Sequence, residues 1–157
     1  AVIEGVLRFA VADLYARYAA HLDAGAYEPW LDLFSDDCRY VVQPRENYDA
    51  GLPLATVRLD SKEMLRDRIH AVTETIYHAP YYQRHLIGPP LIDATTDGAQ
   101  VEANYLVIRT HVAQPSEVFN AGRFVDRLVW QGDRLKIADK LCIFDSELIP
   151  NSMIYPV

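Results

Sequence analysis

The sequence predicts an α+β fold in which helices come first and a strongly curved, mainly antiparallel sheet wraps around them. Residues 2–22 repeat an apolar side chain at every fourth position, which is typical of one helix face. Beyond Pro80 the pattern changes to runs of β-branched and aromatic residues separated by short turn signals. Helices followed by consecutive strands are the order of an α+β domain, in which the helices pack on one face of the sheet.

Helices are predicted in the first half of the chain. The first spans residues 2–22, and Ala24-Gly25 breaks it before a short second helix over residues 27–34. The third is predicted over residues 61–76, with Ser61 as its cap. The residues predicted to face inward are Val2, Val6, Ala10, Leu14, Tyr18 and Leu22 in the first helix, and Met64, Leu65, Ile69, Val72 and Ile76 in the third.

Strands are predicted on both sides of the third helix. The first strand, residues 38–42, follows a Ser35-Asp36-Asp37 turn and ends at Pro44, because proline cannot donate a hydrogen bond to a sheet. Residues 45–60 show no clear periodicity and are predicted to be a long surface loop. The strands of a meander follow, near residues 83–93, 99–112, 117–130 and 134–145.

Composition and charge narrow the class of protein. No linker or repeat interrupts the chain, and 50% hydrophobic composition is enough for one core, so residues 1–157 are predicted to form a single domain. The formal net charge of -7, with scattered Lys and Arg, argues against a nucleic-acid partner. No apolar run reaches the roughly 18 residues that span a bilayer, and the amino end has no signal-peptide pattern. A cytoplasmic protein without a membrane partner is therefore predicted, with Cys38 and Cys142 as reduced, buried thiols.

Motifs for catalysis, metals and cofactors are missing from the sequence, so none of these is predicted in this chain. A Rieske cluster needs Cys-x-His and Cys-x-x-His pairs, and neither Cys38 nor Cys142 is followed by a histidine at those positions. His70, Glu74 and His78 lie at four-residue steps, but a rise of ~1.5 Å per residue separates the histidines by about 12 Å, too far for one ion. A solvated polar face is therefore favoured over a partial metal site that another chain completes.

Charged residues in the meander are candidates for contacts with another protein or for ion pairs within this chain. Arg84 and His85 open a strand just after a proline, where a positive pair can meet a carboxylate of another protein. The alternative, a solvated strand start, is equally compatible with the sequence. Carboxylates on or near the later strands are predicted to form structural ion pairs. They are Asp126, Asp139 and Asp145, with Arg123, Arg127 or Lys140 as partners.

With these elements placed, the sequence resembles a known fold. Residues 17–37, RYAAHLDAGAYEPWLDLFSDD, are similar to the opening of the cone-shaped fold shared by nuclear transport factor 2, scytalone dehydratase and ketosteroid isomerase. Residues 61–88 and 119–145 resemble the small, or β, subunits of aromatic-ring-hydroxylating dioxygenases. The matching positions are Asp67-Arg68, Arg84-His85, Gly122-Arg123-Phe124 with Asp126, and residues 135–138.

This resemblance implies a structural, non-catalytic role within an oxidoreductase. In that family the large, or α, subunit holds the Rieske [2Fe-2S] cluster, the mononuclear iron and the substrate pocket, and a reductase or ferredoxin acts through it. A trimer of small subunits is expected to support three large ones in an α3β3 hexamer. Asp67, Arg68, Arg84 and His85 are expected to contact the large subunit. Residues 46–65 resemble small subunits of oxygenases that act on aromatic acids such as salicylate, anthranilate or terephthalate.

Two other functions of the same fold remain open. A stand-alone isomerase or dehydratase would use the interior of the cone as a pocket, and Tyr18 lies where a ketosteroid isomerase has its oxyanion tyrosine. That chemistry also needs a carboxylate base, and the expected strand position holds Val42. Tyr18 is therefore predicted to be a core residue whose hydroxyl bonds a local group. The other alternative is a non-enzymatic module that binds a small ligand, because composition does not exclude one.

Overall fold

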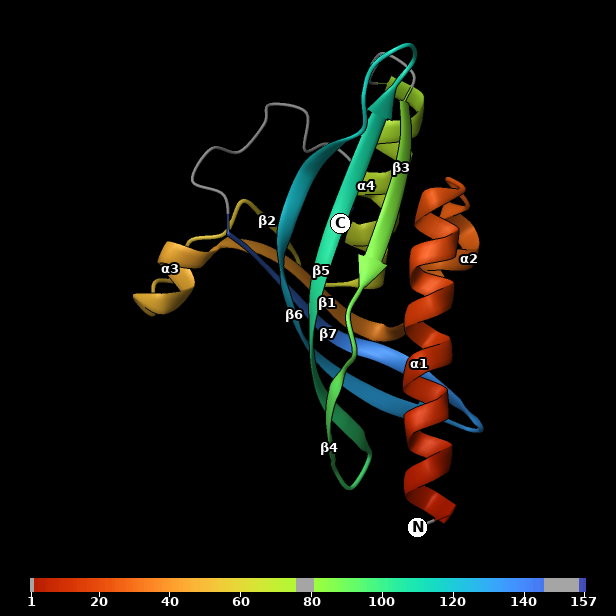
Figure 1. Ribbon diagram of the computed structural model, residues 1–157. Helices are drawn as coiled ribbons and strands as arrows, with labels where there is room; N and C mark the ends of the chain where they lie inside the picture. Colours follow the sequence, from red (N-terminus) through yellow and green to blue (C-terminus); the bar gives the residue numbers. More distant parts are fainter. Residues whose placement is uncertain (1, 76–80, 146–155) are drawn as a thin grey trace.

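The computed structural model describes residues 2–75, 81–145 and 156–157 (Figure 1). Helices lie mostly in the first half of the chain and strands mostly in the second, as predicted. The helices are α1 (Val2–Asp23), α2 (Tyr27–Leu31), α3 (Arg45–Asp49) and α4 (Lys62–Thr75). The strands are β1 (Phe34–Pro44), β2 (Val57–Leu59), β3 (Tyr81–Ile87), β4 (Leu91–Ala94), β5 (Gly98–His111), β6 (Glu117–Gln131) and β7 (Arg134–Phe144).

The described strands join in one mixed sheet. Its order is β2-β1-β7-β6-β5-β3, and β4 also pairs with β5. Neighbouring strands are antiparallel except β1 and β7, which run parallel. The long strands β5 and β6 arch across the molecule, and α1 runs alongside the sheet (Figure 1). This arrangement confirms the predicted α+β fold of amino-terminal helices packed against a curved sheet. None of the described helices is long and apolar enough to cross a membrane.

Glycine permits a close approach of backbones where β6 and β7 meet. Gly122 pairs with Phe144, and a Cβ atom at Gly122 would lie 2.0 Å from the carbonyl oxygen of Ile143. Further along β6, the register shifts between Arg127 and Leu128, as at a β-bulge. A bulge increases the local twist of a strand. The glycine and the bulge are therefore two local features of β6 that suit a strongly curved sheet.

Helix α1 buries one face, but that face differs in part from the predicted one. Val6 is 55% exposed, whereas the prediction placed it inward, and Leu7 is buried instead. A step of four residues turns about 40° more than a full turn of an α-helix, so a strict four-residue line drifts off the buried face. The buried residues of α1 follow one another at steps of four, three, one, three and four positions. They are Leu7, Val11, Leu14, Tyr15, Tyr18 and Leu22.

Aromatic rings fill the centre of the core between the helices and the sheet. Trp30 from α2 is fully buried, with its ring centroid 4.8 Å from that of Phe34 and 5.7 Å from that of Tyr18. Tyr105 stacks on Phe124 at 4.5 Å, which joins β5 to β6. Rings at these separations stabilise a core beyond their burial of apolar area.

The predicted end of the second helix and the turn after it are wrong. Helix α2 ends at Leu31, and β1 already begins at Phe34, so the predicted turn at Ser35-Asp36-Asp37 lies within that strand. Phe34 pairs with Ile137, which places it in the sheet. The register then shifts before the next paired residue of β1, and this irregularity explains the turn-like sequence. Pro44 ends the strand, as predicted.

The predicted loop over residues 45–60 contains regular structure. It holds the helix α3 and the short strand β2, whose Val57 pairs with Val42. Neither element is longer than five residues, which is too short to show a hydrophobic period in the sequence.

Helix α4 follows this segment and matches its prediction in most respects. The backbone N–H of Met64 donates to Ser61 Oγ at 3.1 Å, so Ser61 is the predicted cap. Leu65, Ile69 and Val72 are buried, but Met64 is 43% exposed and was wrongly predicted to face inward. Ile76 lies outside the described residues.

The predicted strand over residues 83–93 is divided into β3 and β4. Gly88, Pro89 and Pro90 separate them, because the two prolines have no N–H to donate to a ladder. Both strands still pair with β5, so the chain continues along the same neighbour after the interruption. The other meander strands match their predicted ranges to within one residue at each end.

Candidate functional site

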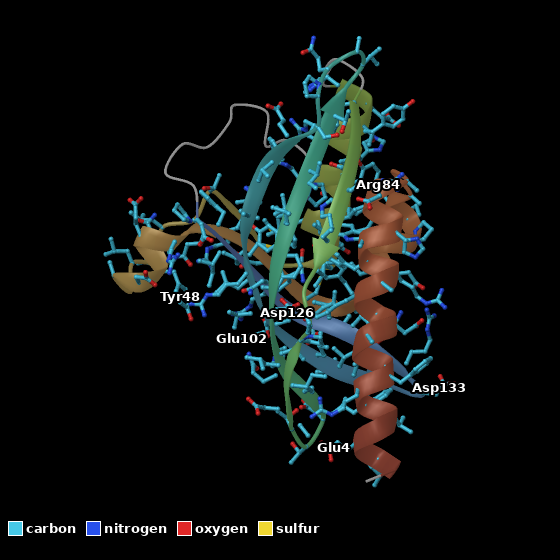
Figure 2. All side chains as sticks on the ribbon, in the orientation of Figure 1. Glu4, Tyr48, Arg84, Glu102, Asp126 and Asp133 are labelled. Atoms are coloured by element: carbon cyan, nitrogen blue, oxygen red, sulfur yellow. The ribbon has the colours of Figure 1, made fainter. Side chains whose placement is uncertain are left out.

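A buried ion pair joins β6 to β7 inside the molecule. Asp126 and Lys140 are paired residues in the register, and Lys140 Nζ lies 2.8 Å from Asp126 Oδ2 with neither side chain exposed. Tyr15 of α1 donates its hydroxyl to the same oxygen at 2.6 Å. Burial raises the pKa of Asp126, and the charge of Lys140 and hydrogen bonds from Lys140, Tyr15 and the backbone of Leu141 oppose that rise. Figure 2 shows Asp126 near the middle of the molecule. This pair confirms the predicted structural role of the carboxylate.

The other predicted carboxylates form ion pairs near the surface. Arg127 Nε lies 2.6 Å from Asp139 Oδ2, and Arg45 Nη1 lies 3.4 Å from Asp145 Oδ1. Arg127 and Asp139 face each other across β6 and β7, as the register places them. Arg45 was not among the predicted partners, because it comes from α3, far away in the sequence.

Tyrosine hydroxyls converge on the last described residue. Tyr18 donates to the carbonyl oxygen of Val157, and Tyr40 donates to the same oxygen at 3.2 Å. Burial raises the pKa of Tyr18 and of Tyr40 well above the ordinary value, so both remain neutral hydrogen-bond donors. Tyr18 is thus a core residue, as predicted, but the prediction of a local partner is wrong because Val157 is 139 residues away.

An isomerase of this fold requires a carboxylate base, and the strand position expected to supply it holds Val42. Val42 is 2% exposed and lies between Val57 and Cys142 in the sheet. Asp126 is the one buried carboxylate among residues 2–75, 81–145 and 156–157, and Lys140 already binds it. A carboxylate held by an ammonium is a weak proton acceptor. This interior therefore suits packing better than proton abstraction.

The candidate metal ligands do not meet in a site. His70 Nε2 lies 3.3 Å from Glu74 Oε2, and both side chains are more than 60% exposed. His78 lies outside the described residues. Within the part of the chain that the structure describes, no group of three or more His, Cys, Asp and Glu residues could hold a metal ion. Cys38 and Cys142 are buried, free thiols, as predicted.

The predicted contact residues lie in different surroundings. Asp67 and Arg68 are exposed on α4, which packs against α2, β1 and β2, whereas β3 packs against α1 and β5. Arg84 is exposed on β3 and labelled at the edge of the molecule in Figure 2. His85 is buried, because successive residues of a strand point to opposite faces. Arg84 and His85 therefore cannot act as one positive pair.

Exposed and half-buried apolar side chains surround Arg84 on the face of the sheet that points away from α1. Arg84 pairs with Ile108, which pairs with Val118 on β6, and Leu86 pairs with Leu106. Paired residues of antiparallel strands share a face, so the register assembles a continuous surface. We call this surface the outer-face patch. Its members are Tyr82 (74% exposed), Arg84, Leu86 (50%), Leu106, Ile108 and Val118 (63%).

His85 is held from the opposite face by the end of α1. Asp23 accepts hydrogen bonds from the backbone N–H of His85 at 2.9 Å and from its ring Nδ1 at 2.7 Å. The His85 side chain is only 1% exposed. Asp23 therefore occupies the free backbone donor of an edge strand, which would otherwise be open to pairing with another chain.

Sequence reasoning missed both the Asp23 contact and the outer-face patch. The alternation of Tyr82, Arg84 and Leu86 with Gln83 and His85 was a signal that Arg84 and His85 face opposite ways. The patch itself had no such signal, because it depends on the register between strands far apart in the sequence.

Comparison with known proteins gives consistent matches over nearly the whole chain. The SnoaL-like domain model matches residues 7–140. The small subunit of anthranilate 1,2-dioxygenase from Burkholderia cepacia is 33% identical over 150 residues, covering 95% of this chain and 93% of that protein. Subunit beta 2 of the terminal oxygenase component of terephthalate 1,2-dioxygenase from Comamonas is 32% identical over 149 residues, covering 94% and 96%. A crystal structure from Novosphingobium aromaticivorans, assigned as the beta subunit of an aromatic-ring-hydroxylating dioxygenase, has a TM-score of 0.90 and 36% identity, covering 99% of both chains.

Proposed function

The chain belongs to the SnoaL-like domain family and to the small, or β, subunits of aromatic-ring-hydroxylating dioxygenases, and we propose that it supports a large oxygenase subunit in a cytoplasmic hetero-oligomer. The likeness to the anthranilate dioxygenase small subunit over nearly its whole length carries this proposal. The chain acts as one domain over residues 1–157 and contributes structure to the complex. The Rieske [2Fe-2S] cluster and the mononuclear iron belong to the large subunit, through which a reductase or ferredoxin acts.

The assembly contains three large and three small subunits, and the small subunits form a trimer. Co-expression with a large chain that bears the Cys-x-His and Cys-x-x-His pairs tests this composition by native mass spectrometry. The expected species holds three copies of each chain, with 17.8 kDa for each small subunit. Another ratio would overturn the stoichiometry, and a small chain that never associates would overturn the proposed role.

The complex acts on an aromatic acid. The named relatives that support this class are dioxygenases of anthranilate and terephthalate, both of which are aromatic carboxylates. Oxygen consumption by the reconstituted complex is expected with such acids and not with naphthalene or biphenyl. The reverse preference would reject the substrate class while leaving the structural role intact.

The outer-face patch is the proposed contact with the large subunit. Protein interfaces commonly combine exposed apolar side chains with arginine, which contributes a large share of the binding energy. Arg84 lies among such side chains, next to Leu86 and opposite Ile108. Asp67 and Arg68 are proposed as a separate contact on α4, where both are exposed. The ring of His85 is buried, so His85 is proposed to support the strand from behind rather than touch the partner.

Replacing Arg84 with alanine tests this contact. The Arg84→Ala variant is expected to bind the large subunit about tenfold more weakly, because a central arginine loses its hydrogen bonds and packing. Its thermal midpoint should stay that of the wild type, since the side chain is exposed. Arg8→Ala is the matched control, because Arg8 is 58% exposed on α1, away from the patch. Equal affinity of the two variants would reject the patch as the contact.

A further inference from the structure

The carboxyl end of α1 is tied to β3 through two residues of that strand. Gln83 Nε2 donates to the carbonyl oxygen of Leu22 at 3.0 Å. Asp23 accepts from the backbone N–H of His85 at 2.9 Å and lies 2.7 Å from its ring Nδ1. In the described sheet β3 is the last strand and pairs with β5. The end of α1 therefore adds a second support to a strand that one neighbouring strand holds.

Asp23 is in an unfavourable place for the helix that carries it. It is the last residue of α1, and the helix dipole puts partial negative charge at that end, which disfavours a carboxylate. The side chain is 13% exposed, and its hydrogen bonds go to His85. A residue that breaks a local preference is often explained by a role elsewhere in the structure. The contacts of Asp23 place that role on β3.

Arg84 lies between the two anchored residues and points the other way. Successive residues of a strand face opposite sides of the sheet, so Gln83 and His85 reach α1 while Arg84 stands in the outer-face patch. The residues on both sides of Arg84 are thus bound to α1, and Arg84 itself pairs with Ile108 of β5. A contact residue recognises its partner well only when hydrogen bonds behind it fix its place.

We propose that Asp23 is a positioning residue for the contact with the large subunit. By holding the backbone and the ring of His85, it sets the place from which Arg84 reaches the partner. Gln83 is the second anchor and acts in the same way through Leu22. This inference rests on the proposed function, because it requires Arg84 to touch the large subunit.

A double-mutant cycle, measured as affinity for the large chain, tests the positioning role. Asp23→Ala is expected to bind about fivefold more weakly, a smaller loss than the tenfold expected for Arg84→Ala, because it displaces the arginine without removing it. The double variant should be about tenfold weaker, like Arg84→Ala alone, since no arginine is left to position. Independent effects would multiply to about fiftyfold, and that result would overturn the positioning role. Wild-type affinity of Arg84→Ala would instead overturn the proposed contact, and the positioning role with it.

Gln83→Leu repeats the cycle from the second anchor, so the test does not depend on how well Asp23→Ala folds. It removes the hydrogen bond to Leu22 and leaves Asp23 in place. Its effect should also disappear in the Arg84→Ala background, because both anchors act through the same arginine. A loss of affinity that persists in that background would overturn the role of Gln83.

Two further variants separate the hydrogen bond from the loss of an acid on α1. Asp13→Ala is the matched control, since the Asp13 carboxylate bonds Arg17 of the same helix at 2.8 Å, and this variant should keep wild-type affinity. Asp23→Asn keeps an oxygen that accepts from the His85 N–H, so it should stay within about twofold of the wild type. Asp23→Asn as weak as Asp23→Ala, or an equal loss in Asp13→Ala, would overturn the proposal.

Discussion

Replacing Lys140 with methionine should destabilise the protein strongly, because the Asp126 carboxylate would lose its counterion in the interior. Lys140 Nζ lies 2.8 Å from Asp126 Oδ2, and both side chains are fully buried. Lys140 Nζ also lies 3.5 Å from the centroid of the Phe124 ring. Methionine is unbranched and nearly as long as the lysine stem, so it keeps the packing against that ring and removes mainly the charge.

The expected cost at neutral pH is about 3–5 kcal/mol, the range for a buried ion pair that loses one partner. Its pH dependence has a definite sign. Burial already raises the pKa of Asp126, and loss of the Lys140 ammonium raises it further. A carboxyl with a raised pKa contributes stability below its ordinary pKa near 4, and that contribution is lost as pH rises through the folded-state pKa. The free energy of unfolding of the variant should therefore be close to that of the wild type in acid and clearly lower than that of the wild type at neutral pH.

Urea unfolding, followed by Trp fluorescence at pH 4.5 and pH 7.5, measures this difference. With a slope of about 2 kcal/mol per molar urea, the expected midpoint shift at pH 7.5 is roughly 2 M. Arg127→Met is the matched control, because its partner Asp139 lies on the same two strands, but the two side chains are 43% and 38% exposed. That variant should lose at most about 1 kcal/mol. A loss for Lys140→Met as small as the control, or equal at both pH values, would refute the reasoning.

Two glycine substitutions should change stability in opposite directions. Gly122→Ala should cost about 3 kcal/mol or more, since its Cβ would lie 2.0 Å from a backbone oxygen. Gly5→Ala should add about 0.5–1 kcal/mol, because nothing lies within 4 Å and α1 gains a better helix former; thermal unfolding checks both, and equal effects would contradict the geometry. Burial raises the pKa of Cys38 to about 11 and that of Cys142 to about 12, so neither thiol should react with a disulfide reagent at pH 8 until urea unfolds the chain. Rapid labelling of the native protein would disprove this.

Much of the secondary structure could be predicted because it depends on neighbours in the sequence. The stripe of α1, the Ser61 cap and the alternation of β5, β6 and β7 all arise from residues a few positions apart. Errors occurred where distant contacts decide the outcome. Phe34 belongs to a strand rather than a helix because it pairs with Ile137.

The candidate sites also depended partly on the sequence and partly on contacts between distant residues. The sequence alone determined the α+β class, the absence of Rieske ligand pairs and a short set of partners for Asp126. Only the tertiary structure selected Lys140 from that set, since cross-strand register decides which side chains face each other. It also decided that His85 is buried and Arg84 exposed, because the elements packed around the sheet determine which of its faces is covered. The outer-face patch exists only after strands that are far apart in the sequence pair with one another.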